Sequence, residues 1–195
     1  MLAKRNIPNL LTMFRVAASL VSLVLFSFNL RYWNEIIFVL FILGAISDYF
    51  DGYFARKYKL DTNFGICFDP IADKIFVLAF FLILIQTKTC SPILAFIILG
   101  RELFVSGLRE FLSKDGISMP VSKLAKWKTG MQMTAIGIMT FRTSEVFASL
   151  FYKAKPLYLF FCTLPMLGNL AMCIAALLTI ITAMDYVLIF LRYKK

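Results

Sequence analysis

Histidine is absent from this chain of 195 residues, and charged residues make up only 16% of it. Without histidine, the chain cannot contain a catalytic triad with a His base or a His-ligated zinc site. A soluble domain carries about 25% charged residues, which is more than this chain has. Hydrophobic residues make up 61% of the chain. So much apolar surface cannot be buried in one soluble core of this length. The composition therefore predicts a membrane protein and excludes a disordered tail, a secreted disulfide-rich module and a nucleic-acid binder.

The chain also has few cysteines, and none of the four forms a spaced motif. Cys67, Cys162 and Cys173 fall within apolar stretches, and Cys90 lies near a polar break. This distribution favours free structural thiols over disulfides or metal ligands.

Six stretches are apolar and long enough for transmembrane helices, each of which needs about 20 residues. Short polar breaks separate them, and no repeat or linker divides the chain. We therefore predict an all-α polytopic membrane protein, a six-transmembrane-helix bundle that forms one domain over residues 1–195. The stretch 156–191 is long enough to include an interfacial segment as well. The predicted spans are about 8–29, 34–56, 63–86, 92–112, 123–141 and 163–191.

Positive charge predicts the orientation of the bundle. The chain has 21 Lys and Arg residues against 11 Asp and Glu, which gives a formal net charge of +10. If the N-terminus is cytoplasmic, most of these cations fall in cytoplasmic breaks, as the positive-inside rule requires. The sequence thus predicts that the N- and C-termini are both cytoplasmic.

Four aspartates cluster at the cytoplasmic ends of the second and third predicted spans. Asp48 and Asp51 are three residues apart, and Asp69 and Asp73 are four apart, so each pair shares one face of its helix. A short basic turn joins the two helices, which are therefore antiparallel and carry all four carboxylates at the same depth. Together these carboxylates need cationic partners, and hard oxygen ligands suit Mg²⁺ or Mn²⁺. We expect two such ions, because a two-metal site stabilises both sides of a phosphoryl displacement.

The alternative is that these acids pair with nearby cations at the membrane surface, although ionisable groups in spans are usually functional. Small residues between the acids leave a hollow that suits either helix packing or a ligand. Arg56, two turns after Asp48, has the fork geometry to bind a diphosphate. The surface partners would be Arg56, Lys57, Lys59 and Lys74, and the small residues are Gly52, Ala55 and Gly65.

The acids and small residues together resemble the signature of the CDP-alcohol phosphotransferase family. The matching string is Asp48-x2-Asp51-Gly52-x2-Ala55-Arg56-x8-Gly65-x3-Asp69-x3-Asp73. The resemblance implies a homodimeric membrane enzyme with six helices and a binuclear metal site open to the cytoplasm. It also implies that an alcohol attacks the β-phosphorus of a CDP-linked lipid and releases CMP, with Asp73 as the general base. The CDP-lipid would contact Asn9, Thr12, Asp48, Gly52, Ala55, Arg56 and Gly65.

Three further stretches are similar to the phosphatidylglycerophosphate synthase branch of this family: 6–15, 101–110 and 122–129. Ala125 departs from that branch, which commonly has Gly there. This resemblance implies CDP-diacylglycerol as the donor and glycerol 3-phosphate as the acceptor, in the inner membrane of a bacterium.

A phosphate-bearing acceptor also needs fixed cations near the metal site. Arg101 and Arg109 are eight residues apart, about 80° around one helix. Lys126 and Lys128 could bind anionic lipid head groups instead of the acceptor, and Arg101 could pair with Glu102. The predicted acceptor-phosphate set is Arg15, Arg101, Arg109, Lys126 and Lys128. Gln132, Thr134 and Thr140 are predicted as polar contacts between helices, without a catalytic role.

Two alternatives to glycerol 3-phosphate transfer are left open by the sequence. Within the same chemistry, the acceptor could be inositol phosphate, or phosphatidylglycerol as in a cardiolipin-type synthase. In another class, intramembrane acids could mark a cation or proton transporter. A transporter would more naturally carry its acids at mid-membrane in broken helices, so the sequence favours the enzyme.

Overall fold

The computed structural model describes residues 7–28, 32–58, 63–114, 116, 123–152 and 155–193. Several side chains inside these ranges, including those of residues 51–58, lie outside the description. Over these residues the chain forms seven α-helices and no strand, which confirms the predicted all-α class. The helices are α2 (Ile7–Phe28), α3 (Trp33–Tyr58), α4 (Asn63–Gln86), α5 (Pro92–Lys114), α6 (Lys123–Arg142), α7 (Glu145–Tyr152) and α8 (Lys155–Tyr193).

Six of these helices coincide with the six predicted spans, and most boundaries agree within two residues. The exceptions are at the C-terminal side. The short helix α7 lies in what the sequence suggested was a polar break, and α8 begins at Lys155 rather than near 163. Two helices contain segments long and apolar enough to cross a membrane, Asn9–Phe28 in α2 and Tyr158–Leu191 in α8. The full six-span topology stays a prediction.

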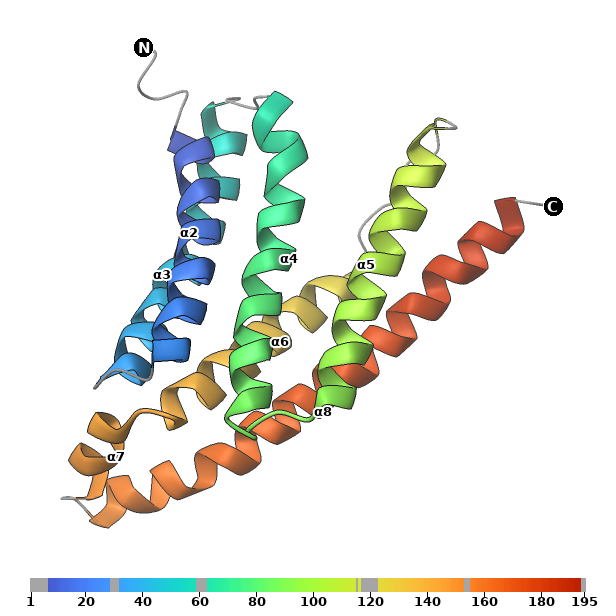
Figure 1. Ribbon diagram of the computed structural model, residues 1–195. Coiled ribbons are helices and arrows are strands. Elements are labelled where there is room, and N and C mark those ends of the chain that lie inside the picture. Colours follow the sequence, from blue (N-terminus) through green and yellow to red (C-terminus); the bar gives the residue numbers. More distant parts are fainter. Residues whose placement is uncertain are drawn as a thin grey trace.

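Helix α2 packs between α3 and α4. It makes extensive contacts with both, whereas α3 and α4 touch each other only slightly. The sequence predicted α3 and α4 as antiparallel neighbours, and Figure 1 shows them running in opposite directions with α2 beside them. The acids of α3 and α4 are therefore joined largely through side chains of α2.

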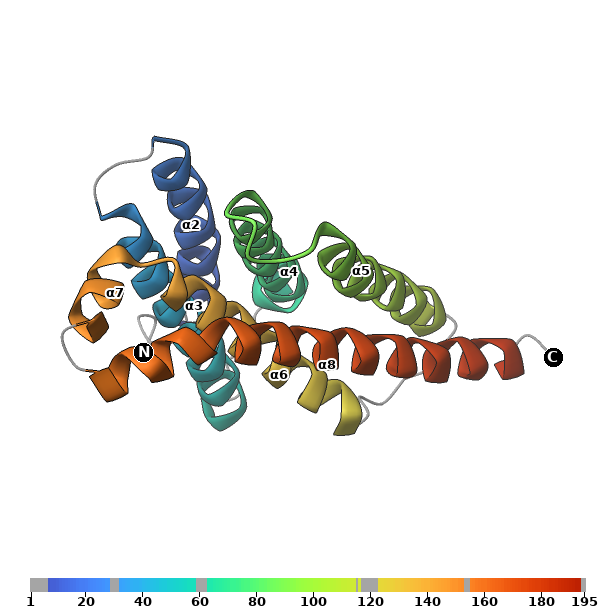
Figure 2. The same cartoon turned by 90° about the horizontal axis from the view of Figure 1, so that it is seen from below.

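The second half of the fold is built on α8. This helix packs most extensively along α6 and also contacts α5 and α7. Figure 2 shows α8 running along the whole length of the molecule, and Figure 1 shows α5 diverging from α4 at one end. The first residue of α2 and the last residue of α8 lie toward this same open end of the bundle (Figure 1).

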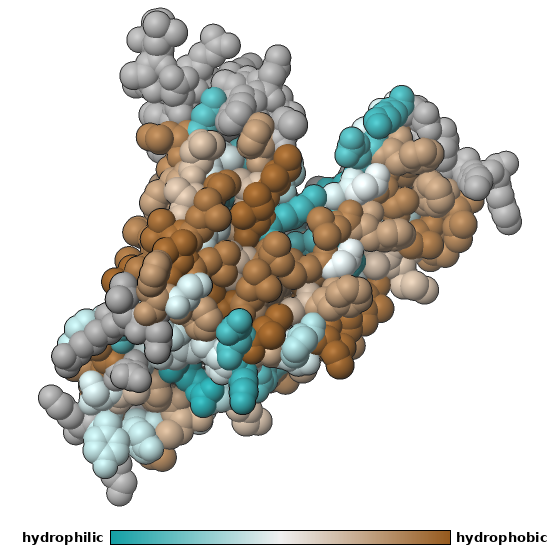
Figure 3. Space-filling view, in the orientation of Figure 1, coloured by the Kyte–Doolittle hydropathy of each residue, from teal (hydrophilic) through white to brown (hydrophobic). Residues whose placement is uncertain are grey.

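Phenylalanines fill the core between the two halves. Phe41, Phe76 and Phe80 are almost fully buried, with ring centroids 4.8–5.7 Å apart. These are ordinary separations for favourable aromatic pairs. The outer surface is apolar as well, as Phe96 and Met166 illustrate with side chains more than 70% exposed. Figure 3 shows these apolar flanks, with hydrophilic side chains gathered in the crevice between the two halves. An apolar exterior around a polar crevice is the arrangement expected in lipid.

Helix α7 is joined to α3 through the partly buried carboxylate of Glu35. Glu35 accepts hydrogen bonds from the Ser144 hydroxyl at 2.7 Å and from the backbone N–H of Val146 at 3.0 Å. The second bond satisfies an N–H in the first turn of α7, where no intrahelical acceptor exists. A negative charge at a helix N-terminus is also stabilising. This cap explains how eight residues form a helix between α6 and α8.

Candidate active site

One aspartate of α3 and one of α4 meet at an arginine of α2. Nη1 of Arg15 donates to Oδ1 of both Asp48 and Asp73, and the Thr12 hydroxyl donates to Asp69. The Arg15 side chain is 2% exposed, while both of its partner carboxylates are about half exposed. Thr12 and Arg15 are three residues apart and so lie on one face of α2. Side chains of α2 thus contact three of the four predicted aspartates.

The donor set of this cluster fits a hard divalent cation. Two carboxylate oxygens from different helices enclose one positively charged nitrogen, and carboxylates are the ligands that Mg²⁺ and Mn²⁺ prefer. Among the residues that the structure describes, no three Asp, Glu or Cys side chains lie close enough to share an ion. Asp51, the remaining predicted ligand, has a side chain outside the described part. The four-carboxylate, two-metal site stays a prediction.

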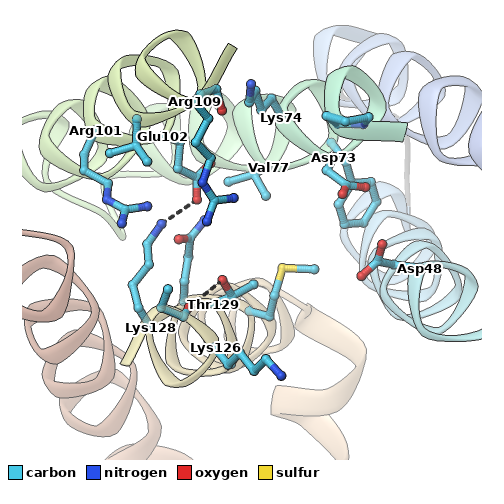
Figure 4. Close-up of a pocket in the computed structure, with 18 of the residues that line it drawn as sticks. Asp48, Asp73, Lys74, Val77, Arg101, Glu102, Arg109, Lys126, Lys128 and Thr129 are labelled. Atoms are coloured by element: carbon cyan, nitrogen blue, oxygen red, sulfur yellow. Dashed lines mark hydrogen bonds and ion pairs between the residues drawn. The ribbon is translucent and has the colours of Figure 1, made fainter. Parts of the chain in front are cut away.

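A pocket of about 1070 Å³ extends from the acids into the crevice, and every long helix contributes to its wall. In Figure 4, Asp48 and Asp73 lie on one side of this pocket, and Arg101, Glu102 and Lys128 lie on the other. Pro70 and Lys74 of α4 complete the acidic side. The lining includes all five residues of the predicted acceptor set: Arg15, Arg101, Arg109, Lys126 and Lys128.

Arg101 and Arg109 are both fixed by helix α8. Arg101 donates from Nη2 to the hydroxyl of Thr182 at 2.9 Å, and Arg109 donates from Nη2 to the hydroxyl of Tyr186 at 2.6 Å. The guanidinium carbons lie 5.3 Å and 5.1 Å, respectively, from the centroid of the Tyr186 ring. These separations are within the range of cation–π attraction. One aromatic ring therefore holds two positive charges together that would otherwise repel each other.

The lysines of α6 differ in their surroundings. Lys128 is buried and donates from Nζ to Oε1 of Glu102 at 2.7 Å. Lys126 is exposed, and its side chain in Figure 4 points away from the two labelled arginines. The charge of Lys128 is therefore partly neutralised within the pocket, whereas the charge of Lys126 is at the rim.

The other predicted site residues have these positions. Asn9 is half-buried in α2, and Gly65 is buried near the start of α4. The sequence analysis grouped Arg15 with the cations that bind the acceptor phosphate. In the structure Arg15 contacts the acids Asp48 and Asp73. The side chains of Asp51, Gly52, Ala55 and Arg56 lie outside the described part, although their backbone belongs to α3.

The sequence analysis missed Thr182 and Tyr186. Both are nearly fully buried, and their spacing of four residues places them on one face of α8. Polar side chains at this spacing in an apolar stretch were the available signal. The sequence does not indicate that α8 packs beside α5, so the partners of these two side chains could not be predicted.

Comparison with known proteins shows the family of this chain. Residues 5–183 match the CDP-alcohol phosphatidyltransferase family. A protein of Rickettsia typhi is 41% identical over 182 residues, which cover 93% of this chain and 95% of that protein. A protein of Cereibacter sphaeroides is 45% identical over 138 residues, or 69% of this chain and 62% of that protein. A protein of Haemophilus influenzae is 36% identical over 143 residues, which cover 71% of this chain and 77% of that protein.

All three relatives bear the name CDP-diacylglycerol--glycerol-3-phosphate 3-phosphatidyltransferase. The family match covers nearly the whole length over which α2 to α8 build the pocket. It also favours an enzyme over the cation transporter considered from the sequence. The chain is therefore a transferase that belongs to the CDP-alcohol phosphatidyltransferase family.

Proposed function

We propose that this enzyme transfers the phosphatidyl group of CDP-diacylglycerol to the 1-hydroxyl of sn-glycerol 3-phosphate, giving phosphatidylglycerophosphate and CMP. The observation that carries this proposal is one pocket with carboxylates on one side and arginines on the other. The carboxylate side suits a diphosphate bound with metal ions, and the arginine side suits an acceptor that carries a phosphate. The names of the relatives support the same donor and acceptor.

The carboxylate side would hold two Mg²⁺ or Mn²⁺ ions through Asp48, Asp51, Asp69 and Asp73. When bound, such ions supply positive charge that neutralises the diphosphate and stabilises the pentacoordinate phosphorus. Arg15 already provides one positive charge between Asp48 and Asp73. The CDP group would bind along α2, α3 and α4, on Asn9, Thr12, Asp48, Gly52, Ala55, Arg56 and Gly65.

The arginine side would bind the acceptor phosphate. Arg101 and Arg109 present planar guanidinium groups, which suit bidentate contacts to phosphate oxygens. Their hydrogen bonds to Thr182 and Tyr186 each use only one Nη2 atom, so other N–H groups of each guanidinium can serve a ligand. Lys126 and Lys128 add positive charge, and Glu102 limits the contribution of Lys128.

Asp73 would act as the general base. Its carboxylate lines the pocket and is half exposed, so an acceptor hydroxyl can reach it. The hydroxyl oxygen forms a bond to the β-phosphorus while its proton moves to the Asp73 carboxylate. The bond from the β-phosphorus to the bridging oxygen breaks, and CMP leaves with that oxygen. The chain thereby performs acid–base chemistry without histidine.

The topology belongs to the same proposal. We place six spans in the inner membrane of a bacterium, with both termini and the pocket facing the cytoplasm and with the enzyme as a homodimer. The two apolar segments in α2 and α8 support insertion. The start of α2 and the end of α8 lie toward one end of the bundle (Figure 1), which supports a shared side for the two termini. The acyl chains of the donor would stay among membrane lipids.

Radiolabelled acceptors test the proposed reaction. Membranes containing the enzyme, CDP-diacylglycerol and Mg²⁺ should convert labelled glycerol 3-phosphate into phosphatidylglycerophosphate and release equimolar CMP. The Asp73→Asn variant should lose at least about 100-fold in rate, the lower end expected for a general base. Asp185→Asn, which removes an exposed carboxylate of α8, serves as the matched control. Label entering lipid only from inositol phosphate would overturn the acceptor, and an active Asp73→Asn variant would overturn the base.

A further inference from the structure

Gln132 has an unsatisfied oxygen in the wall of the pocket. Its side chain in α6 is 1% exposed, and the residue lines the same pocket as Asp73 and Arg109. The Oε1 atom accepts no hydrogen bond from any residue that the structure describes. Burying an amide oxygen without a donor is unfavourable, because its bonds to water are lost and not replaced. A ligand that brings a hydrogen-bond donor would satisfy this atom.

Contacts between helices do not account for this residue. Thr134 and Thr140, the other two polar residues predicted to join helices, donate to the backbone carbonyls of Gly130 and Ile136 at 2.8 Å. Both bonds lie within α6, so these hydroxyls are satisfied without a ligand. In the described part of α6, Gln132 differs from them because it combines a buried, unsatisfied acceptor with a position in the pocket wall.

Helix α5 adds two unsatisfied donors to the wall of the same pocket. The Nε atoms of Arg101 and Arg109 are buried and lack a hydrogen-bond partner among the described residues. Two cationic donors suit an anion, and one amide acceptor suits a hydroxyl group. The complementary ligand is a small phosphate ester that carries at least one hydroxyl besides the one that reacts.

We infer that Gln132 accepts a hydrogen bond from the non-reacting hydroxyl of the acceptor, which is the 2-hydroxyl of glycerol 3-phosphate. This inference rests on the proposed function and makes Gln132 a specificity-determining residue for the acceptor. With the phosphate on Arg101 and Arg109 and the 2-hydroxyl on Gln132, the 1-hydroxyl is the remaining end of a three-carbon chain. That end is then available to the carboxylate side of the pocket, which Asp73 lines.

The test compares two acceptors in several variants. The second acceptor is 3-hydroxypropyl phosphate, which has the reactive hydroxyl and the phosphate but no 2-hydroxyl. The wild-type enzyme should prefer glycerol 3-phosphate by about 10- to 100-fold in kcat/KM, because the analogue leaves the Gln132 oxygen unsatisfied. In Gln132→Met, which keeps the volume and removes the amide, this preference should fall to about threefold or less. Gln132→Asn, which withdraws the amide by one methylene group, should also lose most of it.

Thr140→Val is the matched control, since it removes another buried polar group from α6 outside the pocket. It should keep the wild-type preference. Each preference is a ratio within one preparation, so a smaller folded fraction does not change it. Equal use of both acceptors by the wild-type enzyme, or an unchanged preference in Gln132→Met, overturns the role of Gln132 alone. If the wild-type enzyme converts neither acceptor, the proposed function and this inference are both overturned.

Discussion

Arg15 relieves a repulsion that its own protein creates. Asp48 and Asp73 belong to different helices, and each contacts Nη1 of Arg15. Without a cation between them, the two half-exposed carboxylates would repel each other. A divalent ion bound by the same acids would supply positive charge as well. Arg15 and a metal ion are thus partly interchangeable as sources of stability.

Substitution of Arg15 should therefore destabilise the enzyme most in the absence of metal. We expect Arg15→Gln to lower the free energy of unfolding by about 1–3 kcal/mol in a chelator, the range for hydrogen bonds to charged groups. In excess Mg²⁺ the loss should be smaller. Thermal unfolding of the detergent-solubilised protein, followed by tryptophan fluorescence, measures both values. Arg142→Gln, at the end of α6 next to α7, is the control, and an equal loss with and without Mg²⁺ would contradict the interpretation.

Tyr186 holds both arginines of the proposed acceptor site. Tyr186→Phe removes the hydroxyl that accepts from Arg109 but keeps the ring beneath both guanidinium groups. We expect the KM for glycerol 3-phosphate to rise about 3- to 10-fold, equivalent to the loss of one hydrogen bond, with kcat within twofold. Steady-state kinetics at varied acceptor concentration separates the two constants. Tyr158→Phe, earlier in the same helix, should change neither, and a fall in kcat alone for Tyr186→Phe would contradict a positioning role.

At the scale of the helices, one glycine permits α3 and α4 to approach each other. A methyl group added at Gly44 would collide with the ring of Phe76. That ring cannot move freely, because it packs against Phe41 and Phe80 in the buried core. The approach of α3 to α4 at Gly44 therefore leaves no room for a side chain.

Replacement of Gly44 by alanine should consequently cost stability despite the better helix propensity of alanine. We expect a loss of about 1–3 kcal/mol, typical of overpacking in a core. Gly100→Ala in α5 is the matched control, since no atom lies within 4 Å of its added methyl group, and it should be neutral or slightly stabilising. Thermal midpoints in one detergent compare the two variants. Equal midpoints would show that Phe76 can move aside.

The helices were predictable from the sequence because each apolar stretch is long and ends at charged or Pro residues. The short helix α7 was not, since its N-terminus depends on Glu35, more than 100 residues away in the chain. The spacing of Asp48 and Asp73 predicted a shared location, but not that Arg15 of α2 would lie between them. The partners of Arg101, Arg109 and Lys128 likewise depend on which helices pack together, and spacing within one helix carries no such information.

At the scale of the whole molecule, α5 connects the two ends of the bundle. It begins after the connection that contains Ser91 and ends near Ser113, and both serines are exposed. If the pocket faces the cytoplasm, Ser113 is on the cytoplasmic side and Ser91 is outside. Two equivalent substitutions can therefore report the orientation of the protein.

We expect Ser91→Cys to react with a membrane-impermeant maleimide in intact spheroplasts, and Ser113→Cys to react only after permeabilisation. The unsubstituted enzyme is the blank. Burial raises the pKa of the neighbouring native thiol, Cys90, to about 11, and the thiolate is the reactive form. Cys90 should therefore label slowly at neutral pH and leave the new thiol visible. The reverse labelling pattern would mean that the pocket faces the other side of the membrane.

Helix α8 is long in relation to any bilayer. Its 39 residues extend over about 58 Å at 1.5 Å per residue, roughly twice the hydrocarbon thickness of a membrane. A helix of this length adapts to a thinner or thicker bilayer by changing its tilt. Because Thr182 and Tyr186 lie toward one end of α8, such a change moves the groups that hold the acceptor arginines. The acyl-chain length of the surrounding lipids should thus set the turnover of this enzyme, which would match phospholipid synthesis to the thickness of the membrane being built.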